Sequence, residues 1–296
     1  MSNAIESASA SEQVRNAFNF SIDKFPLQGP DGMRTPWYGL FRSDNGEVVG
    51  DGSVTNRYLP HQTDDVVALV EACESVFDKS SGVSTYFRDG HYVTVAPSKE
   101  YRRQIFGTND NVFPRLIIRG GYDRSAFSVT LGVYRDVCDN LAIIRDVAET
   151  HQAIRHTSGL REKMDELVGQ FRVLKNGWSN LTDAIVRMQE SSVSMVDFLN
   201  QVYPQPELGA TDRAVAIHRN RTEAIFRRLR SERWKTQRPS IDNTFTVSAW
   251  EAFNAVQGYV QHDATRRRSH RGSFQRILMA SKDPHVIKAE QLALSA

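Results

Sequence analysis

The chain has 296 residues, of which 40% are hydrophobic and 24% are charged. This composition is ordinary for a folded globular protein and excludes disordered and collagen-like classes. The formal net charge of +2 does not by itself favour nucleic acid or a membrane as a partner. The two cysteines, Cys73 and Cys138, are too few for a disulfide scaffold or a cysteine-rich zinc site.

The N-terminal residues are small and polar, without the basic start and apolar run of a secretory signal. The longest apolar runs fall far short of the roughly 20 residues that a membrane-spanning helix needs. We therefore expect a cytoplasmic protein with no membrane partner. Residues 1–34 are predicted to be a flexible segment, because short polar chain ends are seldom tied down.

Strand and turn signals dominate residues 35–150, which we predict to form an α+β sheet domain. Asn-Gly, Asp-Gly and Gly-Gly steps separate short runs of β-branched and aromatic residues, a pattern typical of hairpins. The predicted strands are 37–41, 48–49 and 54–59, followed by the hairpins 83–88 with 91–96 and 115–119 with 126–134.

One helix interrupts these strands. Thr63 is the predicted N-cap, and the acidic residues Asp64 and Asp65 suit the positive end of the helix dipole. Apolar residues then recur at helical spacing to about Asp78.

The period becomes helical after residue 136, and residues 151–296 are predicted to form a helical region packed on the sheet or extending it. Gly177 is expected to break one helix, and the two prolines of 204–209 to form a loop. The predicted helices start at 141–150 and continue as 158–176, 181–190, 193–203, 211–236, 248–268 and a short helix after Pro284.

The predicted fold class is therefore α+β, with an N-terminal mixed or antiparallel sheet that carries one inserted helix, followed by a C-terminal helical region. Hairpins in place of repeated strand–helix units argue against a parallel Rossmann-like sheet.

The small net charge conceals an asymmetry between the two halves of the chain. Residues 1–150 have a net charge of −5 and residues 151–296 a net charge of +7. The densest basic stretch is 213–238, which contains nine Lys or Arg residues and two acidic residues, Glu223 and Glu232. The guanidinium group of arginine can donate two parallel hydrogen bonds to the oxygens of one phosphate, so this stretch favours a polyanionic partner.

We predict an amphipathic helix here, with Ala214, Ile217, Ile225, Leu229 and Trp234 as its buried stripe. A second basic cluster follows at 266–271, and the two could form one positive groove. The alternative is a solvated helix face with intrahelical ion pairs. The candidate nucleic-acid-binding residues are Arg219, Arg221, Arg227, Arg228, Arg230, Arg233, Lys235, Arg266, Arg267, Arg268 and Arg271.

The chain lacks the usual catalytic and nucleotide-binding motifs, including a phosphate-binding loop, a dinucleotide fingerprint, a nucleophile elbow and a zinc-protease motif. We predict no cofactor and no metal. His151 and His156 are five residues apart, which is not the spacing of a helical metal pair; they are better explained as a polar junction in which His156 helps to cap the next helix.

Polar residues gather where strands give way to helices. An enzyme site could form there, with Cys138 as a nucleophile activated by a neighbouring base or cation. The alternatives are a structural hydrogen-bond network and a cysteine that is simply buried. The candidate residues at this junction are Arg135, Cys138, Asn140, Arg155 and His156.

Aromatic residues of the predicted strands could stack on unpaired bases if they stood on an open sheet face. Ordinary core packing is the alternative. The residues concerned are Tyr86, Phe87, Tyr92, Tyr122, Phe127 and Tyr134.

Three stretches resemble the phage- and plasmid-associated family known as domain of unknown function 932. The first is 52–62 (GSVTNRYLPHQ). The second runs from Asp123-Arg124-Ser125 through 135–141 (RDVCDNL) to Arg155-His156-Thr157. The third is 250–262, which contains Asn254-Ala255-Val256-Gln257-Gly258-Tyr259. Family members have Cys-Asn or Cys-Ser before Asn-Thr-Leu, whereas here Cys138-Asp139-Asn140-Leu141 is one residue shorter. The resemblance implies a protein of phages, plasmids or prophages, located in the host cytoplasm, and carries over no catalytic residue.

These observations lead to one main hypothesis and two alternatives. The main hypothesis is a mobile-element protein that binds nucleic acid, DNA rather than RNA, without catalysis, as in single-strand binding or annealing during recombination or replication; such a protein could form homo-oligomers. The alternatives are an enzyme with its site at the sheet–helix junction, and an inhibitor or adaptor that binds a host protein.

Overall fold

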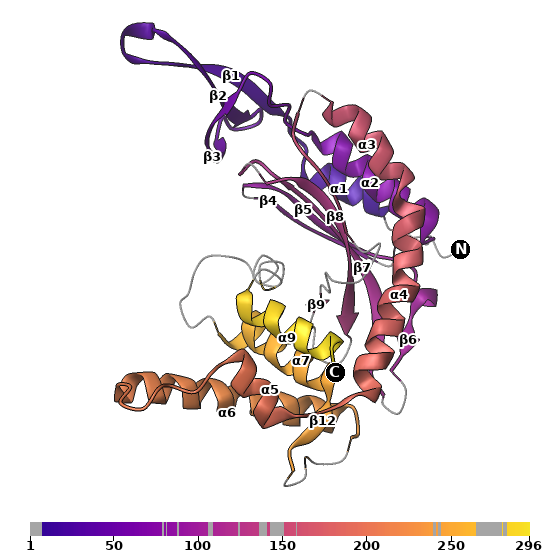
Figure 1. Ribbon diagram of the computed structural model, residues 1–296. Helices are drawn as coiled ribbons and strands as arrows, with labels where there is room; N and C mark the ends of the chain where they lie inside the picture. Colours follow the sequence, from indigo (N-terminus) through magenta and orange to yellow (C-terminus); the bar gives the residue numbers. More distant parts are fainter. Residues whose placement is uncertain are drawn as a thin grey trace, which may run out of the picture. The chain divides into compact units, whose positions relative to one another are not determined.

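The computed structural model has the α+β architecture predicted from the sequence, with sheets in the N-terminal part and helices in the C-terminal part (Figure 1). It describes residues 8–78, 80, 82–87, 89–105, 109–123, 125–135, 141–142, 151–157, 159–238, 241, 244–264, 280 and 283–296.

The chain divides into two compact units built from interleaved segments. The first unit comprises residues 1–101, 115–131 and 149–177, and the second comprises 102–114, 132–148 and 178–296. The chain therefore passes between the units several times, whereas the sequence had suggested contiguous boundaries at 34 and 150. Each unit is described by itself below.

The segment predicted to be flexible contains regular structure. Helix α1 (Ala10–Ala17) begins with a capping box in which Ser9 and Glu12 bond to each other's backbone N–H, and it buries Ala10 and Val14. Strand β1 (Ile22–Gln28) pairs with β2 (Arg34–Arg42), which pairs with β3 (Val48–Thr55), all antiparallel. A short 3₁₀ helix, η1 (Pro30–Gly32), lies in the turn between β1 and β2. Helix capping and strand pairing thus order the described part of residues 1–34, which the composition had predicted to be flexible.

Helix α2 (Thr63–Val76) is the inserted helix, and its cap is Gln62 rather than the predicted Thr63. The Asp65 carboxylate accepts the Gln62 backbone N–H at 2.6 Å. The Thr63 hydroxyl instead donates to the Phe18 carbonyl oxygen at 2.9 Å, so this side chain ties α2 to the segment after α1.

The larger sheet has seven strands in the order β10-β8-β7-β5-β4, with β6 beside β7 and β9 beside β8. The two hairpin regions predicted from the sequence are present, whereas two strands are found where helix had been predicted: β9, at the expected helix start Leu141, and β10. The strands are β4 (Gly82–Phe87), β5 (Gly90–Ala96), β6 (Arg103–Gln104), β7 (Asn111–Gly121), β8 (Phe127–Arg135), β9 (Leu141–Ala142) and β10 (His151–Ile154), with the 3₁₀ helix η2 (Lys99–Tyr101) after β5.

The remaining helices follow the predicted order with two differences. Helix α3 (Leu160–Gly169) is followed by α4 (Phe171–Glu190), which runs through Gly177 because the neighbouring Leu174, Trp178 and Leu181 are buried and outweigh the roughly 1 kcal/mol that a helical glycine costs. The predicted helix 193–203 is a strand, β11 (Ser192–Ser194), and a helix, α5 (Met195–Val202).

The second unit contains the rest of the helices. Helix α6 (Asp212–Lys235) matches the predicted basic helix, and α9 (Pro284–Leu294) matches the predicted last helix. Strand β12 (Thr246–Ser248) pairs with β11. Helix α7 (Ala249–Gly258) packs against α6 and α9, is buried at every residue, and continues into a π-helical turn, η3 (Tyr259–Asp263).

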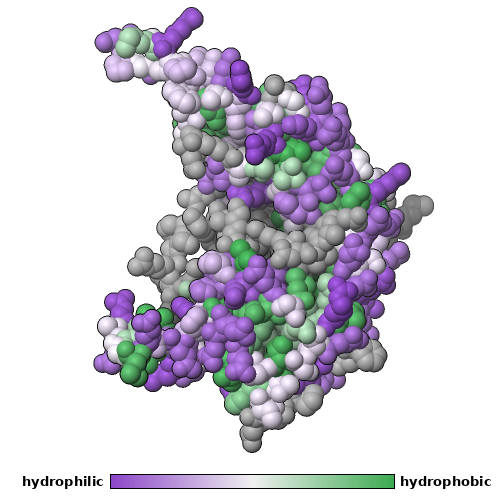
Figure 2. All heavy atoms as spheres, in the orientation of Figure 1, coloured by the Kyte–Doolittle hydropathy of each residue, from purple (hydrophilic) through white to green (hydrophobic). Residues whose placement is uncertain are grey.

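Hydrophilic residues cover most of the helical surface that faces the viewer in Figure 2. No helix in the described part of the chain is long and apolar enough to cross a membrane.

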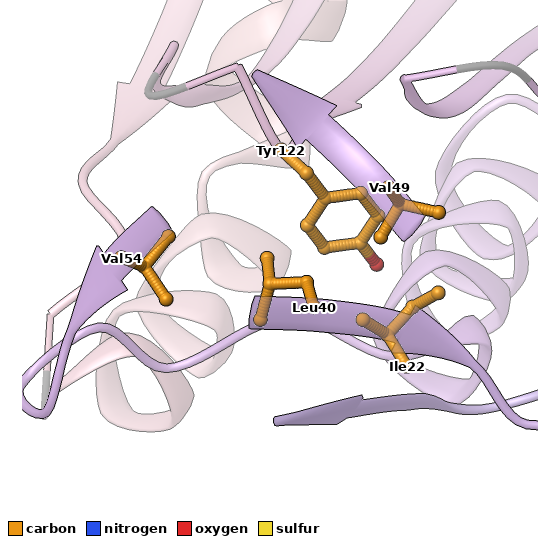
Figure 3. Packing of buried hydrophobic residues seen from close by; sticks show 5 residues of the cluster. All are labelled: Ile22, Leu40, Val49, Val54 and Tyr122. Atoms are coloured by element: carbon orange, nitrogen blue, oxygen red, sulfur yellow. The ribbon is translucent and has the colours of Figure 1, made fainter. Parts of the chain in front are cut away.

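A compact apolar cluster joins the small sheet to the end of β7 in the first unit. Ile22, Leu40, Val49 and Val54 pack around the ring of Tyr122 (Figure 3). Gly50 lies against the backbone of Tyr122 with φ of +81°, and a Cβ there would collide with the Tyr122 carbonyl. Glycine is therefore required at this close approach. The cluster fixes Tyr122, which in turn contacts the buried histidines described below.

Candidate functional site

Helix α6 carries most of the residues that the sequence had assigned to nucleic-acid binding. Thr211 caps it by accepting the Ala214 N–H at 3.3 Å. Ile225 and Leu229 are buried as predicted, but Ile217 is 48% exposed and Trp234 is 80% exposed. The expected apolar stripe is therefore wrong at both ends of the helix. Ile225, Leu229 and Glu232 lie on the side of α6 that packs against the rest of the second unit. Trp234 follows Leu229 by five residues, a spacing that turns it away from that side.

Some of the arginines on α6 are engaged in the fold. Arg228 pairs with Asp263 at 3.0 Å, and Arg233 pairs with Glu251, near the start of α7, at 2.8 Å. Arg238 reaches the second oxygen of Glu251 at 3.0 Å, and the Arg221 guanidinium lies 4.5 Å from the Tyr203 ring centroid. These half-buried cations attach α6 to its neighbours, and their acidic partners lie outside the helix. The intrahelical pair among the described residues of α6 is Arg219 with Glu223, at 4.0 Å.

The other basic residues of the helix face solvent. Arg227 and Arg230 are exposed and lie three residues apart, with Trp234 four residues further on. This spacing puts all three on one face of the helix. The further exposed basic residues are Arg213, Arg219 and Lys235, and the acidic residues exposed beside them are Asp212 and Glu223. We call Arg227, Arg230 and Trp234 the exposed α6 stripe.

Glu232 does not neutralise this surface, because its side chain is buried. Its carboxylate accepts a hydrogen bond from the Arg135 guanidinium at 2.7 Å, and Arg135 also donates to Asp110 from Nε at 2.8 Å. The Arg135 guanidinium lies 5.6 Å from the Trp250 ring centroid. Arg135, Asp110 and Glu232, which we call the buried ion triad, join β8, the loop before β7 and α6 within the second unit. Arg135 is thus held by structural contacts.

The other junction candidates are not gathered into one site. Arg155 is exposed and His156 is buried, and both belong to the first unit, whereas Arg135 belongs to the second. Cys138, Asn140, Arg266, Arg267, Arg268 and Arg271 lie outside the described residues. Cys73, the other cysteine, is buried, and burial raises the pKa of its thiol.

The first unit buries a histidine cluster that the sequence did not predict. His61 lies just before α2 and His91 is on β5, and the Nε2 atom of His61 is 3.0 Å from Nδ1 of His91. The Tyr122 hydroxyl donates to the His61 carbonyl oxygen at 2.7 Å. Thr63 Oγ1 is 3.4 Å from Nε2 of His91. Both imidazoles are completely inaccessible to solvent.

A third histidine, His156, completes this cluster by ring stacking. The His61 ring stacks on Tyr122 with centroids 4.4 Å apart, and the His156 ring stacks on Tyr58 at 5.1 Å. His156 therefore does not cap α3, whose N-cap is Gly159. Nδ1 of His61 and both ring nitrogens of His156 are buried without a hydrogen-bond partner of normal geometry.

Burial keeps these imidazoles neutral. Desolvation, with a smaller contribution from Arg42, lowers the pKa of His91 to about 3. The pKa of His61 falls well below its usual value through burial and through the neighbouring His91 and His156. Burial also lowers the pKa of His156, against the opposing effects of the Leu59 backbone and Asp123. No group of three or more His, Cys, Asp or Glu within the described residues is placed to hold a metal ion.

The aromatic residues considered for base stacking are all at least partly covered. Tyr92, Tyr122 and Phe127 are buried, and Tyr86, Phe87 and Tyr134 are half-buried. Core packing accounts for the first three. The aromatic residue whose exposure the sequence did not predict is Trp234. It was assigned to the buried stripe because apolar side chains at helical spacing usually lie in a core.

Comparison with known proteins gives one match. A family model described as "Domain of unknown function (DUF932)" matches residues 51–280, which is more than half of the chain and includes α6, the buried ion triad and the histidine cluster. No curated protein and no solved structure matches.

The histidine cluster predicts that the protein loses stability in mild acid. Below about pH 6.5 the unfolded chain takes up protons that the buried rings do not accept. The free energy of unfolding should therefore fall for both His61 and His91, and for His91 by about 2 kcal/mol between pH 7.5 and pH 5. The loss from His91 should continue until the pH reaches its folded pKa, about 3.

Urea unfolding at pH 7.5 and at pH 5 measures this loss. Carboxylates also titrate, so the informative quantity is the difference between the wild type and His91→Gln. The pH-dependent loss should be smaller in the variant by about 2 kcal/mol. An equal loss in both proteins would contradict the assignment.

The buried ion triad predicts a severe effect of losing its cation. Arg135→Met leaves Asp110 and Glu232 buried without their counter-ion and should cost about 3–5 kcal/mol of unfolding free energy in urea titrations. The triple variant Asp110→Asn/Arg135→Met/Glu232→Gln removes all three charges and should recover much of that loss. As a control, Arg230→Met at the surface should stay within about 0.5 kcal/mol of the wild type. A small effect of Arg135→Met would contradict this interpretation.

Proposed function

We propose that this chain, which belongs to the family with the domain of unknown function 932, binds nucleic acid without catalysing a reaction on it. The binding surface is the exposed part of α6, centred on Arg227 and Arg230. The observation that carries the proposal is the distribution of charge on this helix, since five basic side chains are exposed beside two acidic ones, Asp212 and Glu223, while Glu232 faces inward.

Charge and chemistry support a phosphate-bearing ligand. Arg213, Arg219, Arg227, Arg230 and Lys235 are exposed on one helix, and a guanidinium can donate two parallel hydrogen bonds to a phosphate. The helix is long enough, at 24 residues and about 1.5 Å per residue, to contact several successive phosphates. Such contacts release counterions, which makes binding strongly dependent on salt.

The finer parts of the proposal are the kind of nucleic acid and its setting. We propose DNA rather than RNA, and a role in the recombination or replication of a phage or plasmid within the host cytoplasm, because this is the setting that the family resemblance implies. Arg221, Arg228 and Arg233 contribute by holding α6 in place, since their contacts are directed into the second unit.

Reversing the two central charges tests the proposal. Arg227→Glu/Arg230→Glu should weaken binding of a labelled 30-mer of either strand type, measured by fluorescence anisotropy at several salt concentrations. If each arginine neutralises one phosphate, the slope of log affinity against log salt should become shallower by about 1.8 for a duplex and about 1.4 for a single strand.

A matched control separates local contact from net charge. Arg34→Glu/Arg103→Glu changes the net charge equally at two exposed positions on other elements, β2 and β6, and should retain most of the affinity. Equal losses in the two double variants would show that α6 is not the binding surface. If the wild type binds no DNA or RNA at low salt, the proposed function is wrong.

A further inference from the structure

We infer that Trp234 makes the α6 surface selective for single-stranded nucleic acid, by stacking on an unpaired base between arginine–phosphate contacts. This inference rests on the proposed function, because the arginines beside Trp234 must first bring a strand to α6. It assigns to Trp234 a role in specificity, whereas its sequence pattern had placed it in the core.

The first observation is the exposure of the indole. Of the four tryptophans, Trp178 and Trp250 are buried, whereas Trp234 is 80% exposed in the last turn of α6. Tryptophan has the largest apolar surface of any side chain and gains little from a position that leaves it in water. A large aromatic face is therefore free for an external partner.

The second observation is the charge around that face. Arg230 precedes Trp234 by one helical turn and Arg227 by two, and both are exposed on the same side. The Arg233 and Arg238 side chains, which are also close in sequence, are paired with Glu251. The indole thus shares one side of the helix with two exposed arginines, and the guanidinium of one of them, Arg230, lies 5.8 Å from the Phe226 ring centroid. Aromatic and cationic groups on one surface are the combination that binds single strands.

The small sheet shows why exposure alone does not define such a site. Trp37 on β2 is 45% exposed and shares the small sheet with the exposed Phe25 and Val48. Residues 22–57, however, contain four Lys or Arg and five Asp or Glu, so this sheet does not attract a polyanion. Trp37 is consequently a natural control for Trp234.

Strand selectivity follows from where bases can be reached. In a duplex both faces of an internal base are already stacked on its neighbours, so an indole gains contact only with phosphate and sugar. An unpaired base offers a free face, and stacking on an aromatic side chain then adds affinity that tolerates any sequence. The arginines should therefore add affinity for both duplex and single-stranded nucleic acid, whereas the indole should add affinity for the single strand alone.

Three variants test this inference: Trp234→Ala, Trp234→Phe and Trp37→Ala, each titrated against a labelled oligo-dT 20-mer and a 20-base-pair duplex at one salt concentration. Trp234→Ala should weaken single-strand binding by about 5- to 100-fold, the range seen when base-stacking aromatics are removed, and duplex binding by less than about twofold. Trp234→Phe should retain most of the single-strand affinity because it keeps a stacking ring. Trp37→Ala should change neither affinity.

The outcomes separate the inference from the proposed function. If Trp234→Ala binds both ligands as well as the wild type while Arg227→Glu/Arg230→Glu binds neither, the inference is wrong and the proposed function stands. Equal losses on the single strand and the duplex also overturn the inference, because they indicate a change in the helix rather than lost stacking. If the wild type binds neither ligand, both the inference and the proposed function are wrong.

Discussion

The inward-facing carboxylate of Glu232 is the constraint on which the outer surface of the second unit depends. It meets Arg135, which also pairs with Asp110, so a cation and two anions share a site with almost no access to solvent. Such a group is costly to desolvate and tolerates the removal of neither charge type alone. Because Glu232 must reach Arg135, helix α6 has one permitted rotation about its axis. That rotation buries Ile225 and Leu229 and turns Arg227, Arg230 and Trp234 outward.

This arrangement divides a basic sequence stretch into two sets with different tasks. Glu251 and Asp263 draw Arg233, Arg238 and Arg228 against the fold. Of the two acidic residues counted against the arginines of 213–238, Glu232 is buried, whereas Glu223 is exposed and lies 4.0 Å from Arg219. Fewer arginines than the count suggests are therefore available to a ligand, and the five exposed basic residues share the outer surface of the helix with Asp212 and Glu223.

The sequence predicted those elements whose signals are local and failed where the tertiary context decides. The hairpin of β4 and β5 follows from β-branched residues around Asp89-Gly90, and α6 follows from its cap and length. Strand β10 was missed because four residues of alternating exposure are too short to recognise, and α4 continues through Gly177 because flanking apolar residues are buried. The same limit applies to the candidate site: the predicted apolar stripe placed Leu229 and Trp234 alike in the core, whereas the packing of α6 buries the side that carries Leu229 and leaves Trp234 exposed. The buried ion triad joins residues up to 122 positions apart (Asp110 to Glu232), which no local pattern can show.

The stretches that carry the family resemblance also explain why recognising the family did not reveal a function. The stretch 52–62 supplies Tyr58 and His61, the second stretch supplies Arg135 and His156, and the third supplies Trp250. In the structure these side chains lie in the histidine cluster or against the buried ion triad. They are buried polar and aromatic groups whose contacts must be satisfied inside the fold, and such groups specify a structure more directly than they specify a ligand. The exposed α6 stripe lies between the second and third stretches and belongs to neither. The side chains named here are therefore determinants of the core, and the exposed α6 stripe belongs to the surface that this core supports.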